Sequence, residues 1–124
     1  MVQQDFVLRQ VQQLAQALAQ ALFHKRADQS EQAQGALAAG LESALGLELE
    51  VLCRLPREEV LALCLPDGAR SDERAVAVAD LLRETDSAAG QRRALWLYEA
   101  VLASGGAVPF DVHERIEVLQ ARLP

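Results

Sequence analysis

Residues that favour β-strands are scarce in this sequence. Only 4% of its 124 residues are aromatic, and it contains a single isoleucine and a single threonine. Valine, with 11 copies, is the one strand-forming residue of any frequency. Alanine (22) and leucine (21), which are strong helix formers, dominate instead. This balance excludes an all-β fold, disfavours a parallel α/β sheet and predicts an all-α protein.

Positive charge is also in short supply. The chain has 12 Lys and Arg against 18 Asp and Glu, which gives a net charge of −6 at pH 7 and a pI near 4.8. The longest basic run is His24-Lys25-Arg26. Because Lys and Arg supply most of the affinity for nucleic acid, we expect no nucleic-acid partner.

Long apolar runs and closely spaced cysteines are missing as well. The uncharged run from Gln10 to Phe23 is shorter than the ~20 residues of a membrane span and contains five glutamines. The first residues carry no positive segment followed by an apolar run and a cleavage site, so we expect no secretion signal. Cys53 and Cys64 match no zinc or redox spacing and lie in apolar surroundings. We therefore predict a cytoplasmic protein with two buried thiols and no membrane partner.

The size and the connections predict one domain over residues 1–124. A globule of 13.5 kDa buries about two thirds of its surface, enough for one hydrophobic core. The predicted helices are joined by short connections, with no linker that would separate domains.

The first predicted helix runs from about Gln3 to Arg26. Its apolar residues fall within an arc of roughly 140°, the width of a helix packed on one side; they are Val7, Leu8, Val11, Leu14, Ala15, Leu18, Ala21 and Leu22. The opposite side carries the glutamines Gln10, Gln12, Gln13, Gln16 and Gln20. The basic residues at its C-terminal end suit the helix dipole.

Ser30 is expected to cap a second helix, and Gly46 to end it. Within this helix Gly35 and Gly40 are predicted to mark close approach of a neighbouring helix, since glycine otherwise weakens a helix by roughly 1 kcal/mol. The alternation in residues 47–53 fits a strand or a short helical turn. A lone strand would have no pairing partner, which favours the turn.

The C-terminal half carries further start and stop signals. Pro56 fits the first position of a short helix, and Pro66-Asp67-Gly68 predicts a turn. Ser71 and Ser87 are expected to cap two more helices, the second ending at Gly105-Gly106. Asp111 and Glu114 form a predicted capping box for the last helix, whose apolar stripe is Val112, Ile116, Leu119 and Leu123. The sequence thus predicts five to six antiparallel helices.

Two stretches resemble a known family. The N-terminal Asp5-Phe6-Val7-Leu8-Arg9-Gln10, and the C-terminal Arg93-Ala94-Leu95-Trp96-Leu97-Tyr98 with Phe110 and residues 114–123, are similar to the ends of a family of small bacterial all-helical proteins of unknown function. Members begin with an Asp-aromatic-x-Met-Arg-like signature, and Leu8 stands here where Met is more frequent. No catalytic residue is established in that family, so the resemblance implies none.

Residues 72–102 also resemble one tetratricopeptide unit. Leu81 lies in its first helix, and Ala94 and Tyr98 are four apart in its second. Leu82 takes the place of a small residue, and no second copy is visible. Because a solenoid needs about three repeats, we expect a single tetratricopeptide-like helical hairpin in the C-terminal half.

The sequence contains no arrangement typical of catalysis. His113 and Glu117 are four apart on a helix, but without an HExxH pattern they are interpreted as a solvated face. His24 at a helix end is interpreted as a surface residue, and no glycine cluster forms a phosphate-binding loop. We expect no catalytic residue, metal or cofactor, and hence no enzyme.

Two features are candidate interfaces. Trp96 lies off the apolar face of its helix next to Arg92; it either packs within the chain or anchors a subunit or partner contact, as Trp beside Arg often does. The uncharged face with Gln13, Gln16 and Gln20 is either a polar exterior or a surface of helix-to-helix association. Together they predict a module for protein–protein interaction or self-association, as a homodimer. The alternative is a helical domain that binds a small molecule in an apolar pocket lined by Leu and Val.

Overall fold

A computed structural model describes residues 2–65, 71–104 and 111–123, and within them every regular element is a helix. The helices are α1 (Val2–Arg26), α2 (Ser30–Leu45), α3 (Leu49–Leu52), α4 (Arg57–Cys64), α5 (Ser71–Arg83), α6 (Ala88–Ala103) and α7 (Val112–Arg122). The all-α prediction is confirmed. The described residues form seven helices, where five to six were predicted. The additional helix is α3, a single turn over residues 49–52, and its position agrees with the helical turn that was favoured there over a strand.

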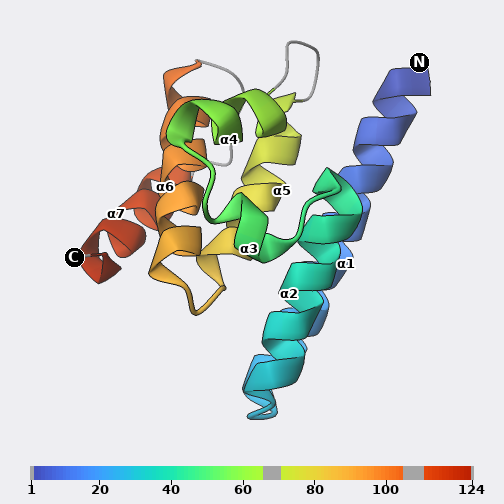
Figure 1. Cartoon of the computed structure of the whole chain (residues 1–124), viewed down its shortest axis with the longest axis vertical. Coiled ribbons are helices and arrows are strands. Elements are labelled where there is room, and N and C mark those ends of the chain that lie inside the picture. The colour runs from blue at the N-terminus through green and yellow to red at the C-terminus, as the bar shows by residue number, and fades with distance from the viewer. Residues whose placement is uncertain (1, 66–70, 105–110, 124) are drawn as a thin grey trace.

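The longer helices form a row in the order α2, α1, α5, α6, α7 (Figure 1). Consecutive helices α1 and α2 make a long antiparallel hairpin, and α5 and α6 make a second hairpin. The short helix α4 lies across α5 and α6, and α3 lies against α2. The two hairpins meet where α1 packs on α5, so α5 lies between α1 and α6.

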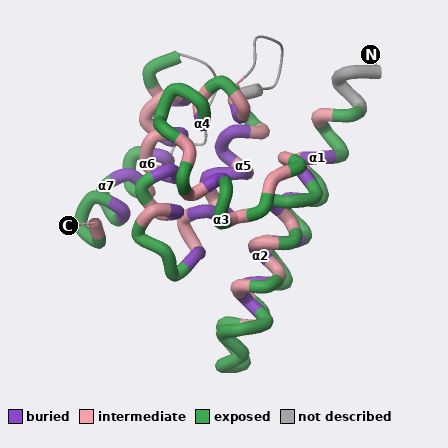
Figure 2. Tube along the Cα trace, viewed as in Figure 1, coloured by how far each residue is buried: buried purple, intermediate pink, exposed green. Residues whose placement is uncertain are grey.

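The hydrophobic core lies around α5 and α6. Figure 2 shows buried residues concentrated where these helices meet their neighbours, whereas the far end of the α1–α2 hairpin is mostly exposed. On α5 and α6 the fully buried apolar side chains recur at helical spacing; they include Ala75, Val78, Ala79, Leu82, Ala94, Leu97 and Val101. The apolar stripe of α7 is confirmed at Val112, Ile116 and Leu119, which are buried. Leu123, its predicted fourth member, lies just after the helix and is half-buried.

Two of the predicted helix ends are confirmed in detail. Gly46 ends α2 in the left-handed conformation, with φ 73°, and its backbone N–H donates to the carbonyl of Glu42. Ser87 caps α6, because its hydroxyl oxygen accepts a hydrogen bond of 3.2 Å from the backbone N–H of Gly90.

Other predicted caps are wrong. Ser30 is the first residue of α2 rather than its cap; Gln29 takes the cap position and makes no side-chain capping bond. Pro56 is the cap residue of α4, one position before the predicted place. Asp111 does stand before α7, but no side-chain capping bond forms. The Arg115 guanidinium binds its carboxylate instead, at 3.1 Å, so the predicted capping box with Glu114 is absent there.

The remaining loop predictions cannot be placed. The turn at Pro66-Asp67-Gly68 and the stop at Gly105-Gly106 lie outside the described residues. The predicted cap Ser71 is instead the first residue of α5, as Ser30 is of α2.

Polar contacts fasten the α1–α2 hairpin to the turn after α5. The Lys25 ammonium donates to the backbone carbonyl of Glu84 at 2.8 Å and to its carboxylate at 2.9 Å. The Gln34 side chain accepts from the backbone N–H of Asp86 at 3.1 Å. Residues near the α1–α2 loop, one from each helix of the hairpin, therefore bind the α5–α6 turn.

Candidate functional site

Helix α1 buries only part of its predicted apolar arc in the fold. Leu14 and Ala21 are buried as expected, but Leu8 is 40% exposed and Ala15 is exposed. Two residues from outside the arc, Gln10 and Ala17, are buried in their place. The buried side is thus rotated towards α2, and part of the apolar arc remains uncovered.

Gln10 was predicted to lie on the polar face of α1, and this interpretation is wrong. It is only 9% exposed, and its side-chain N–H donates to the carbonyl of Ala44 at 2.9 Å. Ala44 lies in the last turn of α2, where carbonyls lack a partner within the helix. The amide is buried because it satisfies one of these carbonyls.

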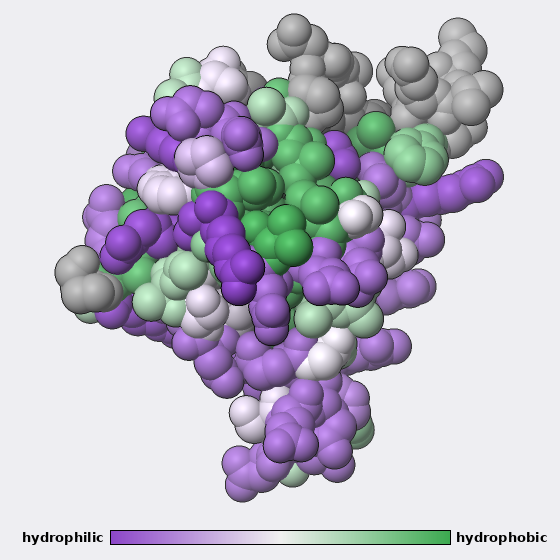
Figure 3. Space-filling view, viewed as in Figure 1, coloured by the Kyte–Doolittle hydropathy of each residue, from purple (hydrophilic) through white to green (hydrophobic). Residues whose placement is uncertain are grey.

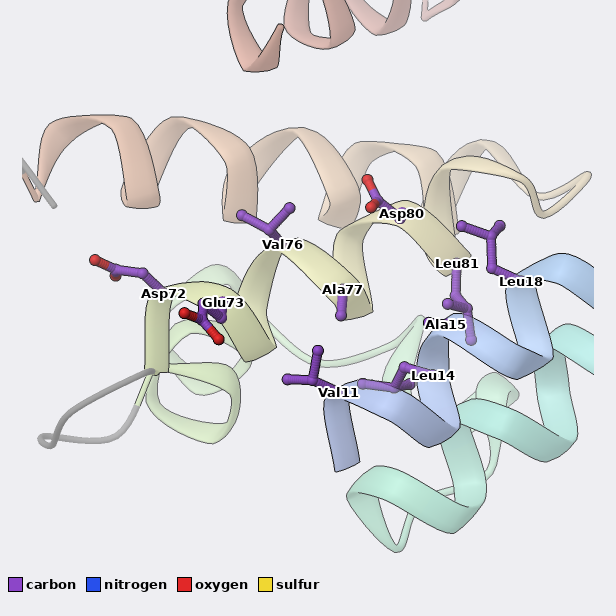
Figure 4. A pocket seen from close by; sticks show the side chains of 10 residues that line it. All are labelled: Val11, Leu14, Ala15, Leu18, Asp72, Glu73, Val76, Ala77, Asp80 and Leu81. Atoms are coloured by element: carbon purple, nitrogen blue, oxygen red, sulfur yellow. The ribbon is translucent and has the colours of Figure 1, made fainter. Parts of the chain in front are cut away.

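The uncovered apolar arc borders a groove of about 270 Å³ between α1 and α5. The two helices run in the same direction along it (Figure 4). Apolar side chains from both helices make up most of the lining; they are Val11, Leu14, Ala15, Leu18, Val76, Ala77 and Leu81. Small residues, Ala15 and Ala77, on the two helices leave this space open.

The polar part of the groove is acidic. Asp72, Glu73 and Asp80 complete the lining, and within the described residues it contains no lysine or arginine. Asp72 accepts a hydrogen bond of 3.2 Å from the hydroxyl of Ser104. The groove therefore combines an apolar floor with carboxylates on its α5 side.

Asp80 belongs to a polar network that joins α5, α6 and α7. Its carboxylate accepts from the hydroxyl of Tyr98, at 2.5 Å, and from the Arg115 guanidinium, at 2.8 Å. Burial and the charge of Asp80 raise the pKa of the Tyr98 phenol far above its usual range. For Arg115, burial lowers the pKa, but the charges of Asp80 and Asp111 outweigh it and raise the pKa overall. The network accounts for the buried hydroxyl and holds Asp80 in place.

The face of α1 with Gln13, Gln16 and Gln20 is exposed to solvent. The same face carries the two most exposed large apolar side chains of the described chain, Phe6 at 60% and Phe23 at 66%. Neither phenylalanine was among the interface residues predicted from the sequence. The available signal was their position on one helical face with the glutamines, at alternating spacings of three and four residues. We call this surface, with Arg9 included, the Phe/Gln face.

Trp96 lies on α6, apart from the Phe/Gln face, because α5 separates α6 from α1. The indole is half-buried and packs against the core. The Arg93 guanidinium lies 4.9 Å from the centre of its ring and donates to the carbonyl of Leu55 at 2.7 Å. Arg92, the predicted neighbour of Trp96, is exposed. Much of the tryptophan surface is thus used within the chain.

Apolar surface is not confined to α1. Figure 3 shows apolar side chains gathered over α4 and the adjoining part of α5. Half-buried leucines of α4, Leu61 and Leu63, pack against the core from this side.

The cysteines occupy different environments. Cys64 is buried, and burial raises the pKa of its thiol to about 11. Cys53 is half-buried; burial raises its thiol pKa too, against the lowering effect of Arg93. In the described ranges no three His, Cys, Asp or Glu side chains come together as metal ligands would. Over the same residues, no helix is both long enough and apolar enough to cross a membrane.

Comparison with protein-family models, with curated proteins and with solved structures finds no match for this chain. The resemblance to the family of small bacterial helical proteins therefore stays a prediction from sequence.

Proposed function

We propose that the chain is a protein–protein interaction module that self-associates as a homodimer through the Phe/Gln face of α1. The observation that carries this proposal is the exposure of Phe6 and Phe23 on one face, at either end of Gln13, Gln16 and Gln20. Exposed aromatic rings favour burial in an interface. Uncharged amides cost less to desolvate than charges, and they can donate and accept hydrogen bonds across a contact.

The energy of such a contact is modest. A phenylalanine side chain carries roughly 150–250 Å² of surface, of which 60% is exposed at Phe6 and 66% at Phe23. Burial of the four rings of a dimer removes on the order of 500 Å² from water, or on the order of 12 kcal/mol. Association costs about 4–15 kcal/mol. We therefore expect a weak dimer, with a Kd on the order of 10–100 µM.

Sedimentation velocity over a concentration series tests this function. The native chain is expected to shift from monomer to dimer between about 1 and 500 µM. Phe6→Ser combined with Phe23→Ser removes the association, and because both side chains are exposed, the variant keeps its helix content and melting temperature. Val118→Ser is the matched control, since Val118 is 46% exposed but lies on α7. A native chain that stays monomeric at 500 µM would contradict the proposal.

A second candidate function is the binding of a small apolar molecule between helices. It is supported by the groove between α1 and α5, with its apolar floor of Leu and Val side chains and its carboxylates on one side. Its volume of about 270 Å³ lies just below the range of pockets that enclose drug-sized ligands. A fatty-acid anion would be repelled by the carboxylates, so a neutral or cationic apolar compound suits the groove better.

The neutral apolar dye N-phenyl-1-naphthylamine is a suitable probe for this candidate. Binding in the groove is expected to raise its fluorescence. Ala15→Leu fills the groove and abolishes the rise, whereas Ala39→Leu, at an exposed alanine of α2, leaves it unchanged. An equal rise with all three proteins would show non-specific binding and contradict this function.

Two finer predictions from the sequence belong with this proposal. The hairpin of α5 and α6 is proposed to have tetratricopeptide-like geometry, which suits a module that contacts proteins through helical surfaces. A cytoplasmic location is proposed from the unpaired cysteines, which suit a reducing compartment.

A further inference from the structure

We infer that the Phe/Gln face pairs with the same face of a second copy in antiparallel orientation, with Phe6 against Phe23 of the other copy. This inference rests on the proposed self-association and adds the partner helix, its direction and its register. It follows from the spacing of the exposed residues along α1 and from the placement of charge.

The residues of the Phe/Gln face have the same order of separations along α1 whether they are followed from the N-terminus or from the C-terminus. Its members, Phe6, Arg9, Gln13, Gln16, Gln20 and Phe23, are separated alternately by three and four residues. This is the spacing of a helix seam that faces one partner helix. Because the series begins and ends with a step of three, reversing one helix brings every member opposite another member. A two-fold axis then passes between residues 14 and 15.

The pairs formed by this reversal are chemically matched. Phe6 meets Phe23, so the rings bury each other at both ends of the contact, about 25 Å apart along the helix. Gln13 meets Gln16 near the axis, where each amide can both donate and accept. Arg9 meets Gln20, whose side-chain carbonyl can accept from the guanidinium. No like charges face each other.

A parallel pair would be poorer on the same residues. In a parallel two-fold pair each residue meets itself, so Arg9 would lie against Arg9 of the second copy. The last turn of α1 carries His24, Lys25 and Arg26, and parallel helices would bring both basic ends together. Antiparallel helices separate these ends by the length of α1 and align their dipoles favourably.

One substitution distinguishes the two directions by the sign of its effect. In the antiparallel pair Gln20→Glu places a carboxylate opposite Arg9 twice, and we expect the Kd to fall about two- to tenfold. In a parallel pair the same change sets two glutamates against each other and raises the Kd. Gln120→Glu, at an exposed glutamine of α7 and therefore outside the face, is the matched control with the same change in charge. Sedimentation equilibrium measures all three proteins.

Cysteine cross-linking tests the register directly. Arg9→Cys and Gln20→Cys proteins are mixed and mildly oxidised, and mass spectrometry separates the mixed dimer from the two self-dimers. The mixed disulfide is expected to dominate, because like positions lie about 16 Å apart along the axis of an antiparallel pair. The native chain gives the background from Cys53 and Cys64, and Gln120→Cys, at an exposed glutamine of α7, mixed with Gln20→Cys is the control outside the face.

The outcomes separate this inference from the proposed function. A dominant mixed disulfide together with a tighter Gln20→Glu dimer supports the antiparallel register. A dimer that forms self-disulfides, or that is weakened by Gln20→Glu, overturns the register but leaves self-association standing. A dimer with no cross-link above background overturns the assignment of this face. A chain that remains monomeric overturns both the inference and the proposed function.

Discussion

Alanine substitutions at Gly40 and Gly35 test the helix packing most directly. Both glycines lie in α2, but Gly40 is in close contact with other helices and Gly35 is not. A Cβ atom added at Gly40 would lie 2.5 Å from the Cβ of Ala17 on α1 and 3.1 Å from Cδ2 of Leu81 on α5. At Gly35 nothing lies within 4 Å. The prediction that both glycines mark close helix approach is therefore right for Gly40 and wrong for Gly35.

The magnitudes follow from two opposing effects. Replacing glycine by alanine inside a helix gains roughly 1 kcal/mol of helix propensity, and this gain applies to both sites. At Gly40 the new methyl forces α1 and α2 apart, because the Ala17 Cβ is fixed to its backbone, and overpacking of this kind costs about 1–3 kcal/mol. We expect Gly35→Ala to stabilise the chain. Its free energy of unfolding should be about 1–3 kcal/mol higher than that of Gly40→Ala. For a chain of this size that difference is about 4–12 °C in Tm.

Urea unfolding, followed by circular dichroism at 222 nm, measures the free energy of unfolding of both variants. A third variant isolates the cause: in Ala17→Gly the contacting methyl is absent, so Gly40→Ala in that background should recover most of the lost stability. A Gly40→Ala protein as stable as Gly35→Ala, or no recovery on removal of the Ala17 methyl, would show that the close α1–α2 contact at Gly40 does not limit stability.

Two further predictions concern pH. The chain has one tyrosine, and burial and Asp80 raise the pKa of Tyr98 well above its ordinary value of 10.0; stability should therefore fall as the pH rises above about 10, and phenolate absorbance at 295 nm should rise only as the helices unfold. Phenolate formed near pH 10 with helicity intact would contradict this. Although burial raises the pKa of Glu84, Lys25 and Arg83 lower it overall from 4.5, so its stabilisation is present above that pH and lost below it. Glu84→Gln should therefore lower the free energy of unfolding by up to about 1 kcal/mol at pH 7. In urea titrations this loss should become smaller as the pH falls from 4.5 towards 3. The same loss at pH 3 as at pH 7 would exclude the ion pair as its cause.

Local signals in the sequence predict the helices well, since each depends on neighbouring residues. Gly46 ends α2 because the left-handed φ of 73° suits glycine, and Ser87 caps α6 because its hydroxyl reaches the N–H of Gly90. Composition alone settled the fold class. Such signals need no knowledge of which helix packs on which.

The failures arise where a distant partner decides. Asp111 stands at the cap position of α7 but makes no capping bond, because Arg115, which also binds the distant Asp80 on α5, binds its carboxylate. Gln10 is buried because the end of α2 presents the carbonyl of Ala44 to it. The apolar arc of α1 was identified, but periodicity does not tell which part of an arc a neighbouring helix covers. For that reason the α1–α5 groove could not be located before the fold was known, and the spacing that places Phe6 and Phe23 on one face with the glutamines did not show how exposed their rings are.

The order of the helices in the row has a consequence for how the chain folds. Helices that follow one another in sequence are mostly neighbours in space, so α1 with α2, and α5 with α6 and α7, can assemble from local contacts. A topology of this kind has a low contact order and allows folding in milliseconds or less. Contacts of α1 and α2 with α5 join the two parts across a long stretch of sequence, and they carry the larger loop-closure entropy. We therefore expect the native state to open first at the contact between the two hairpins, as two cooperative units, each with its own hydrogen-exchange protection.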